Sequence, residues 1–192
     1  RVNSTKTDYE QVADELIKNG YNVEEGVICP EAIRIVKGSS VEDNPLFREG
    51  ILTVQDESAM LVAPAMDLEE GMTILDLCSA PGGKTTHIAE LMNNTGKVYG
   101  FDIYEHKLQL IKNNCDRLGL NTIELGILDA TERSEKLKES GDRVLIDVPC
   151  SGLGIIRKKP EIKYTKREKE LKEIVAIQRK IMENAAGYVK KG

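Results

Sequence analysis

From Thr73 onward, strand-like and helix-like segments alternate, and this alternation limits the possible folds more than any other feature. The strand-like runs are TILDLC (73–78), KVYGFD (97–102), TIELGI (122–127) and RVLIDV (143–148). A helix-like stretch reaches about Met92, and a second has one apolar face made of Tyr104, Leu108, Ile111, Cys115 and Leu118. Strands separated by helices of this length form right-handed crossovers and a parallel sheet. The sequence therefore predicts an α/β fold with four parallel strands.

The end of the chain indicates an incomplete sheet. TKRE at 165–168 has the form of a capping box and predicts the start of a long helix. The side chains expected to face inward are Leu171, Ile174, Val175, Ile181, Met182, Ala185 and Val189. The chain then stops at VKKG, where a fifth strand is expected to begin. We therefore expect residues 73–192 to be a Rossmann-like domain that lacks its C-terminal strands and leaves the fourth strand as an exposed edge.

Residues 1–72 follow a different pattern, which predicts a small α+β appendage. TDYE at 7–10 has the form of a capping box, and Gly20 can close the helix that follows. The apolar face of that helix comprises Tyr9, Val12, Ala13, Leu16 and Ile17. Strand-like runs at 32–36 and 51–56 flank a turn-rich segment, and 58–66 is helix-like. The expected domains are thus 1–72 and 73–192.

Composition narrows the class of protein. A chain of 192 residues can bury a full core, and no apolar run reaches the roughly 18 residues of a membrane span. No secretory signal opens the chain, whose first residue, arginine, favours a segment of a longer protein. Four cysteines without a C-x-x-C pair, and only two histidines, disfavour a zinc site. We expect a cytoplasmic monomer with reduced thiols, no metal and no membrane partner. The net charge of −5 argues against indiscriminate nucleic-acid binding but leaves room for a local basic face.

The segment DLCSAPGGKTT (76–86) joins the first strand to the next helix. In an open α/β sheet, ligands bind at the carboxyl ends of the strands, where such a loop meets a helix N-terminus. Gly82 and Gly83 lack a Cβ and would let the backbone approach a ligand closely. A P-loop would need a glycine at position 78, which is Cys78, and the dinucleotide pattern G-x-G-x-x-G is absent. The loop therefore favours a different ligand from either motif.

Three aspartates end successive strands beside this loop. Asp102 follows Gly82 by about 20 residues, the spacing at which a carboxylate accepts hydrogen bonds from an unphosphorylated ribose. Asp129 follows the third strand, where it could hold an adenine amino group, and Asp147 closes the fourth. Together they outline a pocket for an adenosine ligand. The alternative is that each aspartate only caps a helix or turn.

These motifs resemble the Sun-type RNA cytosine-5 methyltransferases, particularly bacterial members that modify 16S ribosomal RNA. The resemblance rests on DLCSAPGGKTTH, FDIYEHKLQLIKNNCDRLG, LIDVPCSGLGIIRKKPEIKY, RVN and GILTVQDESAMLV, and runs essentially end to end. It implies S-adenosylmethionine bound on a Rossmann-like sheet, with Asp102 on the ribose, Asp129 beside the adenine and Asp147 beside both cofactor and base. Gln55 and Asp56 would lie near this pocket. The residues that match the family's cofactor loop are Cys78, Ser79, Ala80, Pro81, Gly82, Gly83 and Lys84.

The chemistry of cytosine explains why such a family needs thiols. Carbon 5 is too weak a nucleophile to take a methyl group unaided, and a thiolate that adds to carbon 6 activates it. An acid near N3, for which Asp147 is the candidate, would stabilise the charge that develops on the ring. The resemblance implies that Cys150, in the Pro-Cys motif, helps to release the product, while a Thr-Cys motif on the next strand supplies the nucleophile. No cysteine follows Cys150, so we expect the nucleophile to lie beyond Gly192 and this chain by itself to lack it.

The sequence also departs from the family pattern at Val148, where the family commonly has alanine, and at Tyr164, where it often has tryptophan. Two readings of Cys150 stay open, a thiol that lines the base pocket or a buried inert thiol. We expect Cys115 to pack in the core, Cys78 to contribute backbone to the loop, and His87 and His106 to be surface or packing residues. Cys29 receives no role.

The stretch RKKPEIKYTKREKELK (157–172) carries eight Lys or Arg and three Glu on an otherwise acidic chain. It could border the same site as Cys150 and contact phosphates, with Arg157 and Lys159 as expected RNA contacts and Tyr164 stacked on an unpaired base. The alternative is a solvated helix start. The favoured function is RNA cytosine-5 methylation. A methyltransferase acting on a protein or small molecule, or a non-catalytic cofactor- or RNA-binding module, remain alternatives.

Overall fold

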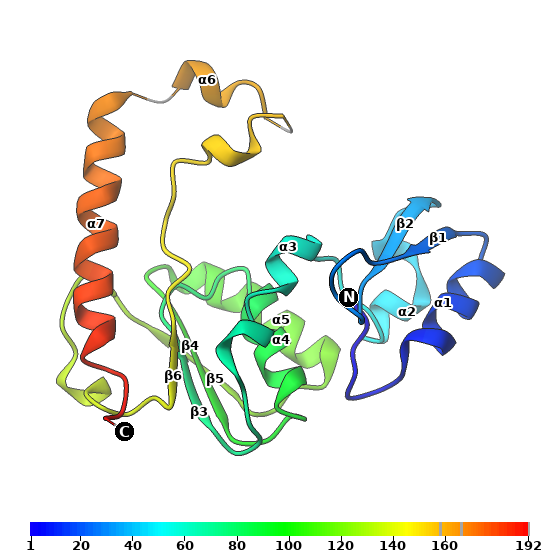
Figure 1. The fold of residues 1–192 in the computed structure, drawn as a ribbon, viewed down its shortest axis with the longest axis horizontal. Coiled ribbons are helices and arrows are strands. Elements are labelled where there is room, and N and C mark those ends of the chain that lie inside the picture. Colours follow the sequence, from blue (N-terminus) through cyan, green and yellow to red (C-terminus); the bar gives the residue numbers. More distant parts are fainter. Residues whose placement is uncertain (158, 166, 192) are drawn as a thin grey trace.

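The computed structural model describes residues 1–157, 159–165 and 167–191, and its centre is a parallel four-stranded sheet (Figure 1). The strands are β3 (Thr73–Asp76), β4 (Lys97–Asp102), β5 (Ile123–Ile127) and β6 (Arg143–Leu145), in the order β5-β4-β3-β6. The predicted α/β class and its four parallel strands are confirmed. The fourth strand is shorter than its apolar run, because its partner β3 ends at Asp76, opposite Leu145.

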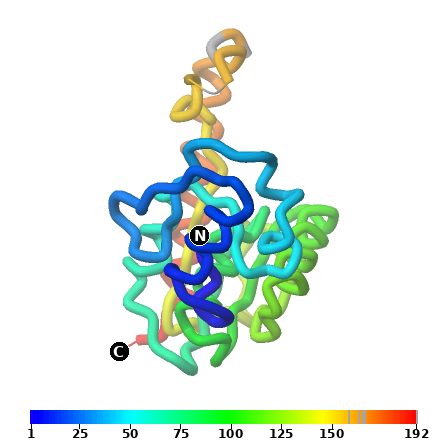
Figure 2. The backbone as a smooth tube through the Cα atoms, turned by 90° about the vertical axis from the view of Figure 1, so that its right-hand side faces the viewer, coloured from blue at the N-terminus to red at the C-terminus, as the bar shows by residue number. Residues whose placement is uncertain are grey.

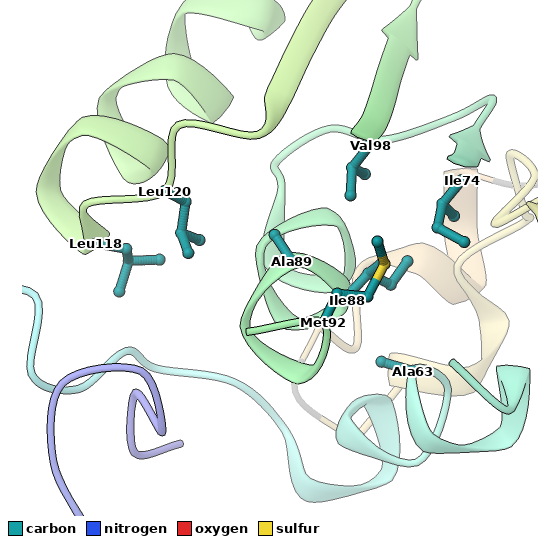
Figure 3. Close-up of a cluster of buried hydrophobic side chains, with 8 residues drawn as sticks. All are labelled: Ala63, Ile74, Ile88, Ala89, Met92, Val98, Leu118 and Leu120. Carbon is teal, nitrogen blue, oxygen red and sulfur yellow. The ribbon is translucent and has the colours of Figure 1, made fainter. Parts of the chain in front are cut away.

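Helices cover both faces of the sheet (Figure 1). α4 (Gly83–Leu91) and α5 (Glu105–Leu118) pack on one face, and α7 (Glu168–Ala186) packs on the other. Neighbouring residues of β3 point to opposite faces, as the pleat of a strand requires. Ile74 joins the cluster under α4, which Figure 3 shows with Ile88 of that helix and Met92, its C-cap, while Leu75 joins the cluster under α7. Both side chains are fully buried, so β3 lies at the centre of a three-layer domain.

The N-terminal part contains α1 (Tyr9–Lys18), an antiparallel hairpin of β1 (Asn22–Glu25) and β2 (Ile33–Lys37), α2 (Pro45–Arg48) and α3 (Glu57–Met60). The expected strand at 32–36 is confirmed as β2. The expected strand at 51–56 is wrong, because only Leu52 forms an isolated bridge, with Val2. β1 was not predicted, since its residues are mostly polar and exposed.

Both expected capping boxes are wrong. The N-cap of α1 is Asp8 instead of Thr7, because Asp8 accepts a hydrogen bond from the Gln11 backbone N–H at 3.0 Å. In the second case, Thr165 ends the short helix α6 (Ile162–Thr165), and α7 begins at Glu168 after Arg167, whose side chain makes no capping bond. A capping pattern predicts the neighbourhood of a helix start but does not select the residue.

The inward face of α7 is narrower than predicted. Val175, Met182 and Val189 are exposed, which contradicts the expectation. The described residues between 150 and 170 extend beyond the sheet as a projecting arm, so only the C-terminal half of α7 reaches the core, which explains Val175 (Figures 1 and 2). That half contacts it through Ile181 and Ala185, followed by Tyr188. Met182 follows the inward-facing Ile181 and so points to another side of the helix, and Val189 lies beyond its last residue, Ala186.

The two parts of the chain share a core. Ala63 is buried in the cluster around α4, and Met66, Leu68 and Met72 pack against the same cluster. The domain boundary at residue 72 stays a prediction. None of the helices in the described part of the chain is both long and apolar enough to cross a bilayer.

Candidate cofactor and substrate site

The glycine loop is tied to the neighbouring strand. Ser79 is buried, and both its backbone N–H and its hydroxyl donate to the carbonyl of Phe101, at 2.8 Å and 2.9 Å. Gly82 has a φ of 101°, and a Cβ there would lie 3.0 Å from a methyl carbon of Ile111 in α5. Glycine is therefore required at position 82 by its backbone conformation and by helix packing, whereas the sequence suggested close approach of a ligand. At Gly83 a Cβ would meet only Gln55, at an ordinary 3.7 Å.

A cavity of about 500 Å³ lies at the carboxyl ends of β3, β4 and β5. Asp102 and Asp129 both line it, as the adenosine hypothesis requires. Much of the remaining lining is apolar, including Leu77, Ile103, Tyr104, Leu128, Pro149, Ile177 and Ile181. Apolar walls with a few polar groups are typical of sites for small-molecule ligands.

Both aspartates also make local turn bonds. Oδ1 of Asp102 accepts the Tyr104 backbone N–H at 3.0 Å and lies 3.7 Å from Nζ of Lys107. Oδ1 of Asp129 accepts the backbone N–H of Thr131 at 2.9 Å and its hydroxyl at 2.7 Å. These bonds hold the pKa of Asp129 below its ordinary value, so that carboxylate is charged at neutral pH. All these contacts end on Oδ1, so Oδ2 of each residue can accept from a ligand.

A second, smaller cavity of about 190 Å³ adjoins the first at Cys78, which lines both. Its lining includes Gln55, Asp76, Lys84 and Asp147. The loop residues Ser79, Ala80, Pro81 and Gly83 also line it, while Gly82 lines neither cavity. Nζ of Lys84 lies 2.5 Å from Oδ2 of Asp147, an ion pair that the sequence did not suggest. The second cavity therefore has a mixed lining of polar and apolar residues and carries a pair of opposite charges.

Asp76 is the site residue that sequence reasoning missed. It ends β3 with 1% of its surface exposed, and its Oδ2 accepts the hydroxyl of Thr85 at 2.7 Å. Its Oδ1 is buried without a hydrogen-bond partner among the described residues. Burial raises the pKa of Asp76 to about 7, against the opposing hydrogen bond from Thr85. An acid inside the apolar run TILDL, directly before the loop, is the signal that could have identified it.

The four cysteines are free and differ in burial. Cys150 is exposed, which contradicts the alternative of a buried inert thiol; its side chain lines neither cavity, although Pro149 lines the larger one. Cys115 is buried, and burial raises its pKa to about 11, as expected of a core thiol. Burial also raises the pKa of Cys78, to about 12. Cys29 is buried beside Glu57, which accepts its backbone N–H at 3.0 Å.

His87 is a packing residue, since 1% of its surface is exposed and Nε2 lies 3.1 Å from a carboxylate oxygen of Glu31. Burial lowers the pKa of His87 to about 3, so its ring is neutral at physiological pH. His106 is exposed and lies against the ring of Tyr104. Within residues 1–157, 159–165 and 167–191, no group of three His, Cys, Asp or Glu side chains is arranged to hold a metal ion.

Most of the described residues of the basic stretch lie on the projecting arm, which follows the carboxyl end of β6 (Figure 1). Arg157, Lys159 and Tyr164 are all exposed, and Tyr164 keeps 87% of its surface accessible. None of the three lines either cavity. Lys158 and Lys166 of the stretch lie outside the described residues. The arm thus presents basic and aromatic side chains at a distance from the loop, and their contact with RNA stays a proposal.

Comparisons with known proteins agree with this geometry. The probable ribosomal RNA small subunit methyltransferase B of Bacillus subtilis (strain 168) is 44% identical to this chain, over 100% of the chain and 43% of that protein. The crystal structure of PH0851 matches with a TM-score of 0.94 and 36% identity, over 100% of this chain and 44% of that one. NSun6 from Pyrococcus horikoshii, solved with SFG, matches with a TM-score of 0.86 over 100% of this chain and 72% of that one. At 21% identity, this last match shows the fold alone.

The chain spans less than half the length of the curated relatives it matches. The model of the family described as 16S rRNA methyltransferase RsmB/F matches residues 63–192, which is most of the chain and includes the whole parallel sheet and both cavities' strand-end acids. The resemblance noted from the motifs is thereby confirmed, and the chain belongs to the RsmB/F family of 16S rRNA methyltransferases.

Proposed function

We propose that the protein containing this chain transfers a methyl group from S-adenosylmethionine to carbon 5 of a cytosine in ribosomal RNA. The observation that carries the proposal is the pair of adjoining cavities at one edge of the sheet. The larger holds Asp102 and Asp129, and the smaller holds the ion pair of Lys84 and Asp147. A donor and an acceptor of a methyl group need two such neighbouring sites, which meet here at Cys78.

The larger cavity fits the nucleoside part of the cofactor. Its apolar walls suit a purine. Oδ2 of Asp102 and of Asp129, whose bonds within the described part of the chain end on Oδ1, can accept from ribose hydroxyls and from an exocyclic amine. The volume of about 500 Å³ is within the range of small-ligand sites. When bound, the cofactor supplies an electrophilic methyl group on a sulfonium.

The smaller cavity fits a pyrimidine edge. Asp147 keeps about half of its side chain exposed, and Lys84 holds its carboxylate in place. From there Asp147 can bond to the polar edge of a cytosine and stabilise the charge that forms while carbon 6 carries a thiolate adduct. Carbon 5 then takes the methyl group, and a base, such as a water molecule, accepts the carbon 5 proton. The electron pair of the broken carbon–hydrogen bond re-forms the carbon 5–carbon 6 double bond as the thiolate leaves.

Cys150 follows Asp147 by three residues in the same loop, and its exposed thiol can reach a substrate. We assign it to the release step, as the family pattern implies. The attacking thiol is expected from a Thr-Cys motif, which this sequence does not contain. The exposed arm with Arg157, Lys159 and Tyr164 would add phosphate contacts and base stacking, and with them salt-dependent affinity for RNA.

Calorimetric titration of the full-length protein with S-adenosylhomocysteine tests the cofactor site. The wild type should bind, and Asp102→Ala should weaken binding about 10-fold to 100-fold, because a hydrogen bond to a charged group contributes about 1.5–3 kcal/mol. Asp116→Ala, which removes an exposed acid from α5, is the matched control and should bind as the wild type does. Absence of binding to the wild type, or equal affinity for all three proteins, would contradict the proposal.

The acceptor is tested separately by transfer of a radiolabelled methyl group. Label should appear in ribosomal RNA and be absent from protein incubated under the same conditions. Label in protein with none in RNA would favour the alternative class of methyltransferase.

A further inference from the structure

Arg1 makes an unusually complete set of contacts beneath the glycine loop. Its guanidinium is fully buried, with 0% of the side chain exposed, and its five N–H donors meet five acceptors. Nε and Nη2 each donate to one carboxylate oxygen of Glu90 at 2.9 Å. The other three bonds go to the hydroxyl of Thr86 at 3.0 Å, the carbonyl of Gly83 at 2.8 Å and Oε1 of Gln55.

These hydrogen bonds reach α4 at several points along its length. Gly83 begins the helix, Thr86 lies one turn later, and Glu90 lies one turn after that. Lys84, which pairs with Asp147 in the smaller cavity, follows Gly83 directly. A cation beside the first turn of a helix is electrostatically unfavourable for the helix itself, and a buried ion pair is weak evidence of stabilisation. The hydrogen bonds of Arg1 are therefore better explained as fixing the position of α4 than as a source of stability.

Arg1 also sets the orientation of the Gln55 amide. Because Oε1 of Gln55 accepts from Arg1, the amide nitrogen Nε2 must point the other way. Nε2 lies 3.7 Å from the position of a Cβ at Gly83, and Gln55 lines the smaller cavity together with Lys84 and Asp147. The amide nitrogen thus lies beside Gly83, which lines the same cavity.

We propose that Arg1 is a positioning residue for methyl transfer. It holds the first turn of α4 in register with Asp147 and turns the donors of Gln55 toward an acceptor atom of the target pyrimidine, such as its ring carbonyl. The inference rests on the proposed function, since it assigns the smaller cavity to the base.

The chain offers a matched control. Arg117 on α5 also joins the two parts of the protein, because it donates to the carbonyls of Phe47 and Leu52 and to the hydroxyl of Thr53 at 2.7–2.9 Å. It makes no bond to the glycine loop or to Gln55 in the described structure. Arg117→Met therefore disturbs the attachment of the N-terminal part without touching the positioning network.

The test compares Arg1→Met/Glu90→Leu, in which no buried charge is left unpaired, with Arg117→Met in the full-length protein. Thermal midpoint, affinity for S-adenosylhomocysteine and kcat for RNA methylation are measured for each. A shift of about 1 Å in catalytic geometry can cost about 100-fold in rate, so kcat of the double variant should fall by about that factor. Arg117→Met should lower the thermal midpoint and keep kcat near the wild-type value. Equal loss of kcat in both proteins, or unchanged kcat in the double variant, would overturn the proposal.

A second measurement asks whether Arg1 acts through Gln55. Gln55→Ala should lower kcat about tenfold in the wild-type background and change little in the Arg1→Met/Glu90→Leu background, because coupled residues are not additive. Additive losses would overturn the assignment. Failure of the wild type to bind S-adenosylhomocysteine or to methylate RNA would instead contradict the proposed function, so the two failures are distinguishable.

Discussion

Replacement of Asp76 by asparagine tests whether burial controls the charge of this carboxyl. Asp76 is buried at the end of β3, and its folded-state pKa of about 7 lies above the ordinary value of 3.8. The unfolded chain loses this proton near pH 3.8, while the folded protein retains it up to about pH 7. The free energy of unfolding therefore falls as pH rises through this interval and levels off above it.

The size of the effect follows from the shift. Roughly three pKa units, at 1.36 kcal/mol each, correspond to about 4 kcal/mol over the whole interval. Between about pH 5 and about pH 8 the expected loss from Asp76 is about 3 kcal/mol. Asparagine cannot ionise and keeps an oxygen for the hydroxyl of Thr85, so Asp76→Asn should remove this loss. Its amide nitrogen adds a buried donor that costs about 1–3 kcal/mol at every pH, which makes the change in slope the more informative quantity.

Urea unfolding of the cofactor-free, full-length protein, followed by circular dichroism at both pH values, measures the slope. Asp129→Asn is the control: the pKa of Asp129 lies below its ordinary value, so this residue titrates outside the interval and its loss should leave the slope unchanged. If the difference in unfolding free energy between Asp76→Asn and the wild type is the same at both pH values, the buried carboxyl does not titrate as described and the reasoning is refuted.

Three further predictions concern the core, the thiols and the arm. Leu75→Ala should reduce the free energy of unfolding by about 2–5 kcal/mol, seen as a lower urea midpoint at unchanged m-value, because Leu75 is fully buried in the central strand; a loss below about 1 kcal/mol would contradict its central position. A thiol reagent should modify exposed Cys150 in the native protein before buried Cys29 or Cys115, and mass spectrometry that finds the reverse order would remove Cys150 from the site. Replacing Arg157, Lys159, Lys169 and Lys172 by alanine should weaken RNA binding and flatten its dependence on salt, by about 0.7 in the logarithmic slope for each lost contact to a single strand; an unchanged slope would return the arm to a solvated surface.

The sequence predictions that are wrong concern features that depend on tertiary contacts. The runs 97–102 and 122–127 give β4 and β5 almost residue for residue, because both strands are apolar and flanked by turns. The strand predicted at 143–148 extends beyond the observed β6, since the end of β6 depends on where its partner β3 stops. The inward position predicted for Val175 on α7 is wrong for a similar reason, because helical periodicity does not reveal that the N-terminal half of the helix extends beyond the sheet.

The same distinction applies to the site. The sequence predicted Asp102, Asp129 and Asp147 as site residues because each ends or closely follows a strand. A parallel sheet brings the carboxyl ends of its strands together. Arg1 and Glu90 were not predicted, because their pairing joins residues 89 positions apart through the packing of the N-terminal segment on α4. The position of an aspartate after a strand can be recognised from the local sequence, whereas the burial of Arg1 and Glu90 cannot.

Capping and ligand binding are compatible roles for the strand-end aspartates in the proposed cofactor site. Oδ1 of Asp102 and Oδ1 of Asp129 accept local turn bonds, which fix the rotamer of each carboxylate before any ligand arrives. A carboxylate that is already oriented loses less conformational entropy on binding, so we expect the capping bond to strengthen the proposed interaction of the second oxygen with the cofactor. For Asp129 the same bonds also lower the pKa and keep the acceptor charged. Thr131→Val, which removes the hydroxyl that bonds to Asp129, should therefore weaken the binding of S-adenosylhomocysteine in the same calorimetric titration, and unchanged affinity would contradict this role of the turn bond.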